Sequence, residues 1–182
     1  MAGPSRILVY GVYGAGKSTL AEELARRLGL PWHPVDDLTW EPGWVEVPTA
    51  VQRQRIGAIC RQRRWILDGA YGSWLDLPLA HADLVIGLDY PRWLSLWRLL
   101  RRTARRVVTR EPICNGNHES LGSVFSTESV VVWHFGSFAR KRRRMRRWQA
   151  GPGGPPVLLF RRPADLERWL AGLGPEAAAS RS

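Results

Sequence analysis

The sequence predicts an α/β fold in which helices cover both faces of a doubly wound, five-stranded parallel sheet. Five short apolar runs of strand length alternate along the chain with segments whose apolar residues recur at helical spacing. This alternation is typical of parallel sheets, because each helix that connects two strands packs back onto a face of the sheet. The 182 residues, 45% of them hydrophobic, suit a single domain over residues 1–182 with a substantial core.

The first half of the chain begins with a predicted strand over residues 6–10 that leads into a Gly-rich turn. Leu20 and Leu24 then recur at helical spacing until Gly29, a residue type that commonly ends helices. Thr49 can cap a further helix. The expected elements after the first helix are a short strand over 31–33, a polar loop rich in Pro and Trp over 36–48, a helix over 49–63 and a buried strand over 65–68.

In the second half of the chain, Pro91 fits the first turn of a helix whose apolar stripe includes Trp93 and Leu96. A polar, Gly-rich segment over residues 111–128 is longer than an ordinary connection, and we expect a small lid-like insertion there. The Ala- and Ser-rich tail over 174–182 should be flexible. The other expected elements are strands over 84–88 and 157–160 and helices over 91–108, 129–149 and 163–170.

The first predicted strand runs directly into Gly11-Val12-Tyr13-Gly14-Ala15-Gly16-Lys17-Ser18, which has the pattern GxxxxGKS of a phosphate-binding loop, the Walker A motif. Glycines allow the tight turn in which backbone N–H groups surround the phosphates, the lysine reaches the β- and γ-phosphates, and the serine hydroxyl binds Mg²⁺. We therefore expect a P-loop NTPase fold that binds ATP or GTP. The expected nucleotide contacts are Gly11, Gly14, Ala15, Gly16, Lys17, Ser18 and Thr19, with Ser18 also a ligand of Mg²⁺.

Three carboxylates follow predicted strands, at the edge of the sheet where a P-loop holds phosphate. Asp68 ends an apolar strand as a Walker B acid does, so it can bind Mg²⁺ directly or through water, or else cap the following turn. Asp89 precedes Tyr90 and Pro91 at the start of a helix, where an Asx turn or a cap is the favoured interpretation. The third carboxylate is Asp36.

Asp36 lies in a segment that contains two tryptophans, Trp40 and Trp44, which a solvent loop would not need. Such a segment can form the wall of an acceptor pocket, and a carboxylate there can take the proton of an acceptor hydroxyl. An acceptor that is already a phosphate needs no such base. The alternative role of Asp36 is to cap or anchor the loop.

Composition narrows the class of protein further. The net charge of +11 comes almost wholly from arginine, which suits both ATP-handling sites and nucleic acid. No apolar run approaches the roughly 20 residues that cross a bilayer, and no signal-peptide pattern precedes the first strand. We therefore expect a cytoplasmic protein without membrane contact. Cys60, Cys114 and the scattered histidines lack metal-ligand spacing, so Mg²⁺ is the metal implied and Cys60 is expected to be a buried free thiol.

The chain resembles an adenylate-kinase-like P-loop family known as DNA topology modulation protein FlaR, within the nucleoside and nucleotide kinase superfamily. The matching blocks are GVYGAGKSTLAEELARRLGLP, HPVDDLTWEPGW, WILDGAYG and ADLVIGLDYPRWLSLWRLLRR, which cover most of residues 6–102. The resemblance implies that Asp36, rather than Asp37, is the acid of the pattern. It also implies that Arg98 and Arg102 clamp the transferring phosphate. The turn after Asp68 lacks the Gly-x-Pro-Arg of true adenylate kinases, so AMP specificity does not carry over.

Basic residues concentrate in two runs, over residues 98–110 and 140–147. Arg98, Arg102 and Arg106 are spaced four apart, so they share one face of a helix that either clamps phosphate or faces solvent. For the run over 140–147 a solvated face is the favoured interpretation, and one or two arginines that reach ATP are the alternative.

The predicted function is a Mg-ATP-dependent kinase of a small-molecule acceptor, either a nucleoside, a nucleotide or another hydroxylated metabolite. One alternative is an ATP-dependent nucleic-acid-associated protein, which the charge allows but which is not favoured because no nucleic-acid motif accompanies it. Another is a regulatory NTPase with negligible transfer. The expected catalytic residues are Lys17, Asp36, Arg98 and Arg102, and the expected metal ligands are Ser18 and Asp68.

Overall fold

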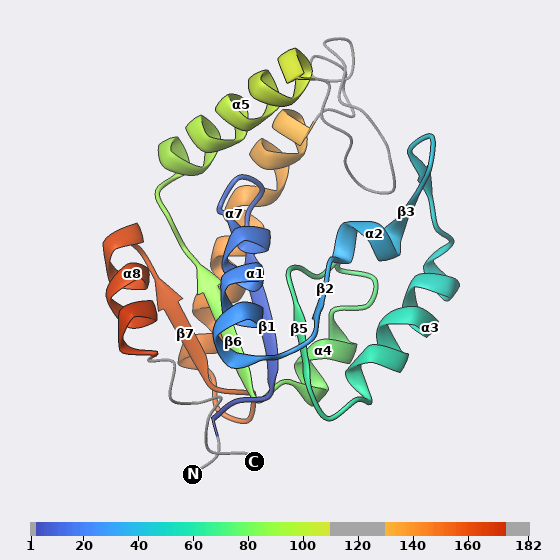
Figure 1. Ribbon diagram of the computed structural model, residues 1–182, viewed down its shortest axis with the longest axis vertical. Helices are drawn as coiled ribbons and strands as arrows, with labels where there is room; N and C mark the ends of the chain where they lie inside the picture. The colour runs from blue at the N-terminus through green and yellow to red at the C-terminus, as the bar shows by residue number, and fades with distance from the viewer. Residues whose placement is uncertain (1–2, 110–129, 174–182) are drawn as a thin grey trace.

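A five-stranded parallel sheet lies at the centre of the computed structural model, which describes residues 3–109 and 130–173 (Figure 1). The strands are β1 (Arg6–Gly11), β2 (Trp32–His33), β5 (Trp65–Leu67), β6 (Leu84–Leu88) and β7 (Val157–Phe160). They stand in the order β2-β5-β1-β6-β7, and every neighbouring pair is parallel. Because β1 is central, the carboxyl ends of β5 and β6 lie on either side of the loop that follows it.

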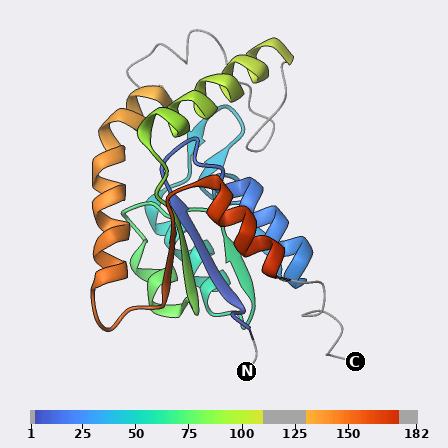
Figure 2. The same ribbon diagram turned by 90° about the vertical axis from the view of Figure 1, so that its left-hand side faces the viewer.

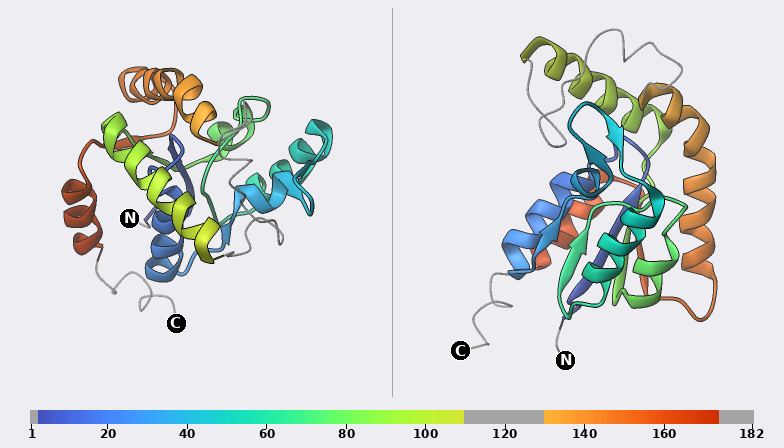
Figure 3. Two further views of the ribbon diagram at one scale, coloured as in Figure 1. Left: turned by 90° about the horizontal axis from the view of Figure 1, so that it is seen from above. Right: turned by 90° about the vertical axis from the view of Figure 1, so that its right-hand side faces the viewer.

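Helices cover both faces of this sheet, which confirms the predicted doubly wound α/β fold (Figure 2). On one face lie α1 (Lys17–Leu28) and α8 (Pro163–Gly172), and on the other α3 (Thr49–Cys60), α4 (Asp76–His81) and α7 (Val130–Ala150). A further helix, α5 (Arg92–Thr109), crosses above the carboxyl edge of the sheet (Figure 3). None of the helices in the described ranges is long and apolar enough to span a membrane. The expected lid over 111–128 and tail over 174–182 lie outside the described residues.

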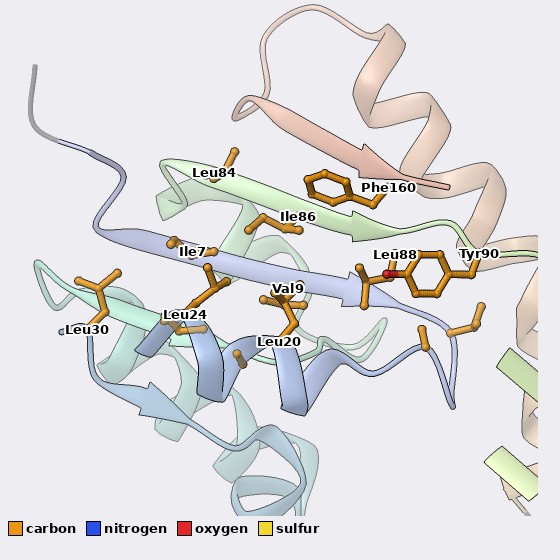
Figure 4. Close-up of a cluster of buried hydrophobic side chains, with 14 of the residues drawn as sticks. Ile7, Val9, Leu20, Leu24, Leu30, Leu84, Ile86, Leu88, Tyr90 and Phe160 are labelled. Carbon is orange, nitrogen blue, oxygen red and sulfur yellow. The ribbon is translucent and has the colours of Figure 1, made fainter. Parts of the chain in front are cut away.

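The core is divided between the two faces by the alternation of side chains along each strand. In β1, Ile7 and Val9 belong to the cluster that α1 covers, whereas Leu8 and Tyr10 belong to the cluster on the opposite face. Figure 4 shows the first of these clusters, in which Leu20 of α1 packs beneath β1. These side chains are almost completely buried, and each contributes about 1.5–3 kcal/mol to stability. The strand that leads into the phosphate-binding motif is therefore firmly held.

Residues 36–48, expected to form a loop, contain regular structure instead. The elements are a short helix, α2 (Val35–Thr39), and an antiparallel hairpin of β3 (Trp40–Glu41) and β4 (Val45–Glu46). The helix is fixed by Asp68, whose Oδ1 accepts the Val35 N–H at 2.8 Å. Trp40 and Trp44 brace the hairpin edge to face, with ring centroids 6.0 Å apart. The loop prediction was wrong because the contact that starts the helix comes from a distant part of the chain.

The sequence pattern also missed α4, because a helix of six residues is too short to show helical periodicity. Contacts with α3 hold it in place. Trp74 Nε1 donates to Gln52 Oε1 at 2.8 Å, and Asp76 forms an ion pair with Arg53 at 2.8 Å.

Cys60 is the buried free thiol that the sequence predicts. Burial raises the pKa of this thiol to about 11, so the group is protonated and unreactive at neutral pH. Cys114 lies outside the described residues.

Asp89 has a different role from the Asx turn or cap that the sequence favours. Its carboxylate is only 1% exposed and accepts a hydrogen bond from Arg146 Nε at 3.0 Å. Arg142 Nε lies 2.8 Å from the other carboxylate oxygen, in an ion pair without hydrogen-bond geometry. Both arginines belong to α7, so Asp89 ties this helix to the end of β6. Arg142 and Arg146 thus bind a buried acid although 35% and 46% of their side chains stay exposed, so the solvated face expected for the run over 140–147 holds in part.

Asp89→Asn should lower the free energy of unfolding by about 1–3 kcal/mol, because Arg142 and Arg146 lose their negatively charged partner. The matched control is Asp165→Asn, whose ion pair with Arg168 lies at the surface and should contribute less than about 1 kcal/mol. Urea unfolding of the two variants measures the difference. Equal losses of stability would contradict an anchoring role for Asp89.

Candidate active site

The loop between β1 and α1 has the backbone geometry of a phosphate cradle. Gly14 and Gly16 adopt φ values of 77° and 91°, which turn the chain tightly before α1 begins at Lys17. Gly16 stands at the N-cap of α1 and has no side chain to occupy the N–H groups of the first turn. These N–H groups carry the positive end of the helix dipole, which favours a bound anion. Ser18 and Thr19 are exposed beside them, so the residues present suit a triphosphate.

Helix α5 packs directly on this loop. A Cβ atom on Gly14 would collide with the carbonyl oxygen of Ser95 and would lie 2.9 Å from Leu99 Cβ. Glycine is therefore required at position 14 both for its backbone conformation and for the close approach of a helix.

Two arginines of α5, one helical turn apart, lie near the phosphate-binding loop. Arg98 Nη1 donates to the Ala15 carbonyl at 3.5 Å, and its guanidinium lies 5.3 Å from the ring centroid of Tyr90. The pKa of Lys17 is lowered mainly by burial, and the charge of Arg102, one turn further along α5, adds to this effect. The structure thus brings both predicted arginines to the loop, whereas the Arg106 side chain lies outside the part of the chain that is described.

Lys17 lies between the loop and two of the predicted carboxylates. Its Nζ donates to the Val12 carbonyl at 3.2 Å. Burial lowers the pKa of Lys17, while the negative charges of Asp36 and Asp68 raise it. These two carboxylates come from different elements, so their approach to one ammonium group is a result of the tertiary fold.

Asp68 is buried and uses one carboxylate oxygen to hold α2 through the Val35 N–H. Asp68 therefore caps α2. The cap that the sequence suggested as an alternative was at the turn after its own strand. Its carboxylate and the exposed Ser18 hydroxyl offer oxygen ligands, which Mg²⁺ accepts together with several waters. Across the described ranges, no three His, Cys, Asp or Glu residues gather into a metal site. The donor set fits Mg²⁺ that is held jointly by protein, nucleotide and water.

Asp36 is exposed at the start of α2 and faces two aromatic side chains. The Tyr71 hydroxyl donates to Asp36 Oδ1 at 3.3 Å, and Trp40 Nε1 donates to the Tyr71 oxygen at 3.4 Å. This chain of hydrogen bonds links Asp36 to the hairpin and to the turn after β5. The carboxylate is thus oriented while still open to solvent, as a residue that meets an acceptor must be.

Sequence reasoning missed three residues of this site, Tyr13, Tyr71 and Lys141. Two ammonium groups lie near the Tyr13 ring, whose centroid is 5.5 Å from Lys17 Nζ and 4.5 Å from Lys141 Nζ. Lys141 belongs to α7, far away in sequence from the loop. The available signal was its rarity, because Lys141 and Lys17 are the two lysines among 27 basic residues.

The pKa values of the site reflect burial and a local excess of charge. Burial and the neighbouring charge of Lys17 lower the pKa of Lys141 to about 7. Burial, followed by the charge of Asp36, raises the pKa of the Tyr13 and Tyr71 hydroxyls, which therefore remain protonated donors. Burial and the charges of Asp36 and Asp68 raise the pKa of Asp37.

Three solved structures share this fold along nearly the whole chain. A gluconokinase from Sinorhizobium meliloti 1021 has 19% sequence identity and a TM-score of 0.56, with 97% of this chain and 95% of that chain covered. A sugar kinase from Janibacter sp. HTCC2649 has 17% identity and a TM-score of 0.51, covering 97% and 99%. A shikimate kinase from Bacteroides thetaiotaomicron has 13% identity and a TM-score of 0.52, covering 94% and 96%.

The fold is therefore that of P-loop kinases, with a five-stranded parallel sheet flanked by helices. No family model matches the chain, and no curated protein matches it. The resemblance to the FlaR family accordingly stays a prediction.

Gly14→Ala should cost more stability than Gly153→Ala and should also weaken ATP binding. Both glycines have positive φ, 77° and 88°, so both substitutions carry the roughly 1–2 kcal/mol cost of a left-handed alanine. A Cβ on Gly153 meets nothing within 4 Å, whereas one on Gly14 meets α5. Urea unfolding and ATP titration measure the two effects. Equal stabilities together with unchanged ATP affinity would contradict the packing of α5 on the loop.

Proposed function

We propose that this protein is a Mg-ATP-dependent kinase that phosphorylates a hydroxyl group of a small-molecule acceptor. The observation that carries the proposal is the convergence of Lys17, Asp36 and Asp68 at a loop with the conformation of a phosphate cradle. Similarity to a gluconokinase, a sugar kinase and a shikimate kinase supports it, because each is named for a small acceptor.

On the donor side, the backbone from Gly11 to Thr19 surrounds the phosphates and Lys17 neutralises their charge. Ser18 and Asp68 would hold Mg²⁺, which would supply positive charge to neutralise the phosphates of ATP. Arg98 and Arg102 approach from α5, on the opposite side of the loop from β1. In this arrangement catalysis comes from positioning and charge neutralisation rather than from a covalent intermediate.

On the acceptor side, Asp36 takes the proton of the acceptor hydroxyl. The hydroxyl oxygen forms a bond to the γ-phosphorus of ATP, the bond from that phosphorus to the β–γ bridging oxygen breaks, and ADP leaves with the electron pair. Tyr71 and Trp40 keep the Asp36 carboxylate in place through their hydrogen bonds. An exposed carboxylate held by aromatic neighbours fits this role better than a simple cap, since its oxygen accepts from a side chain rather than from a helix N–H.

The test is a screen for ADP release from Mg-ATP in the presence of nucleosides, nucleotides, sugars, sugar acids and aminoglycosides. The proposal predicts release that depends on the acceptor and is abolished by Lys17→Ala with the fold intact. ADP release that is independent of every acceptor would favour the regulatory NTPase instead.

Asp36→Asn should lower kcat by about 10²–10⁴ with ATP affinity nearly unchanged, because the variant keeps the size of the side chain but loses the base. Asp37→Asn is the matched control and should retain most of kcat. Steady-state kinetics with a hydroxyl acceptor measures both variants. An Asp36→Asn enzyme with wild-type kcat and KM would reduce Asp36 to a structural residue.

A second candidate function, binding of nucleic acid, is favoured by one observation on α7. Four arginines at helical spacing i, i+3, i+4 and i+7 line a hollow of about 180 Å³, and they are Arg140, Arg143, Arg144 and Arg147. Within the described ranges, no carboxylate lies at ion-pair distance from Arg140, Arg143 or Arg147. Guanidinium groups without acidic partners suit the phosphates of a polyanion.

The double substitution of Arg143 and Arg147 by Gln separates the two functions, since it spares Arg142 and Arg146, which hold α7 to Asp89. A kinase should keep wild-type phosphoryl transfer in this variant. A nucleic-acid-binding protein should bind DNA more weakly, and its salt slope should flatten by about 0.9 for each phosphate that the variant no longer neutralises. Salt-titrated DNA binding and acceptor-dependent ADP release are measured side by side. A DNA defect with no transfer activity in the wild type would favour nucleic-acid binding over the kinase function.

A further inference from the structure

The ammonium group of Lys141 lies at the phosphate-binding loop. Its Nζ is 4.5 Å from the ring centroid of Tyr13 and 5.9 Å from that of Tyr10. In the described part of the chain, Lys141 forms no ion pair with a carboxylate. The neighbouring Arg142 and Arg146 bind the buried Asp89, so the helix that carries Lys141 is tied to the end of β6.

Charged groups from three elements surround this ammonium. Lys17 of α1 repels it, Asp36 of α2 attracts it, and Arg140 and Arg144 on α7 itself repel it. Burial, followed by the excess of positive charge, lowers the pKa of Lys141 to about 7. A half-buried amine in this setting is stabilised in its charged form when an anion arrives.

Lys141 contacts the loop differently from Lys17. Lys17 contacts the loop backbone, through the Val12 carbonyl, whereas Lys141 contacts the loop through the ring of Tyr13. The carboxylate whose charge acts on Lys141 is Asp36, the residue assigned to the acceptor. Lys141 therefore lies near the proposed acceptor carboxylate as well as near the loop.

We propose that Lys141 binds an anionic group of the acceptor, so that the acceptor is a hydroxylated carboxylate or phosphate ester rather than a neutral alcohol. The proposal rests on the kinase function above and adds the class of substrate to it. Asp36 then meets the hydroxyl of the acceptor, and Lys141 meets its anionic group.

A binding experiment tests the proposal without requiring turnover. Because the chain has two lysines, ¹³Cε-lysine labelling gives two NMR signals, and Lys141→Arg identifies which belongs to Lys141. In the Mg-ADP complex, added inorganic phosphate, gluconate or glucose 6-phosphate should raise the titration midpoint of Lys141. Sorbitol and glucose, which have similar hydroxyls without the anion, should not. A midpoint that no anion moves would overturn the proposal.

Steady-state kinetics then tests two points: whether the anionic group is a carboxylate or a phosphate ester, and whether Lys141 contacts the acceptor or ATP. Lys141→Met should raise KM for an anionic acceptor at least tenfold and leave KM for ATP within about twofold. The control for removal of one positive charge is Arg168→Gln on α8, which should change neither. Gluconate against sorbitol tests a carboxylate, and glucose 6-phosphate against glucose tests a phosphate ester. A matching rise in KM for ATP would place Lys141 on the donor side and refute the proposal.

The pH dependence supplies a signature that a structural role would not produce. The bound anion raises the pKa of Lys141 above its free value of about 7, so binding takes up a proton above that pH. KM for the anionic acceptor should therefore rise above pH 7, by up to tenfold per pH unit, in the wild type. In Lys141→Arg, which stays charged, the dependence of KM on pH should disappear.

The two proposals fail in different ways. If no acceptor causes release of ADP, the kinase function is refuted, whereas turnover of neutral and anionic acceptors alike would refute only the role of Lys141.

Discussion

The pairing of β1 with β5 on one side and β6 on the other fixes the position of every candidate site residue. Its register places Leu8 beside Leu67 and Gly11 beside Leu88, so the residues that follow β5 and β6 emerge on either side of the phosphate-binding loop. A slip of one residue would move each side chain of β1 to the opposite face of the sheet, and the packing of both core clusters would be lost. The buried core therefore holds the site in register.

Two buried acids use this edge of the sheet in different ways. Asp68, after β5, holds α2 through the Val35 N–H, and Asp89, after β6, holds α7 through Arg142 and Arg146. Each of these segments carries a charged residue of the proposed acceptor side, Asp36 on α2 and Lys141 on α7. The two buried acids thus position Asp36 and Lys141 indirectly, because each acid ties the helix that carries one of these residues to the end of a strand.

The arginines of α5 and α7 have several different roles. Two arginines of α7 bind the buried Asp89, others line a hollow on α7, and those of α5 approach the phosphate-binding loop. Cations that crowd one region raise its electrostatic free energy, and a bound anion relieves this repulsion. The same physical reason supports triphosphate at the loop, an anionic group near Lys141 and, as an alternative, a polyanion along α7.

The sequence by itself determined the five strands of the central sheet, the main helices and the phosphate-binding loop, because these depend on local patterns: apolar runs, helical spacing and glycines at fixed positions. It also pointed to Asp36 and Asp68, since parallel strands end at one edge, and the family resemblance pointed to Arg98 and Arg102. Only the tertiary structure decided that Asp68 caps α2, that Asp89 anchors α7 and that Lys141 and Lys17 both lie at Tyr13. Those contacts join residues 33 to more than 100 positions apart, and no local periodicity records which distant side chain will meet a buried charge.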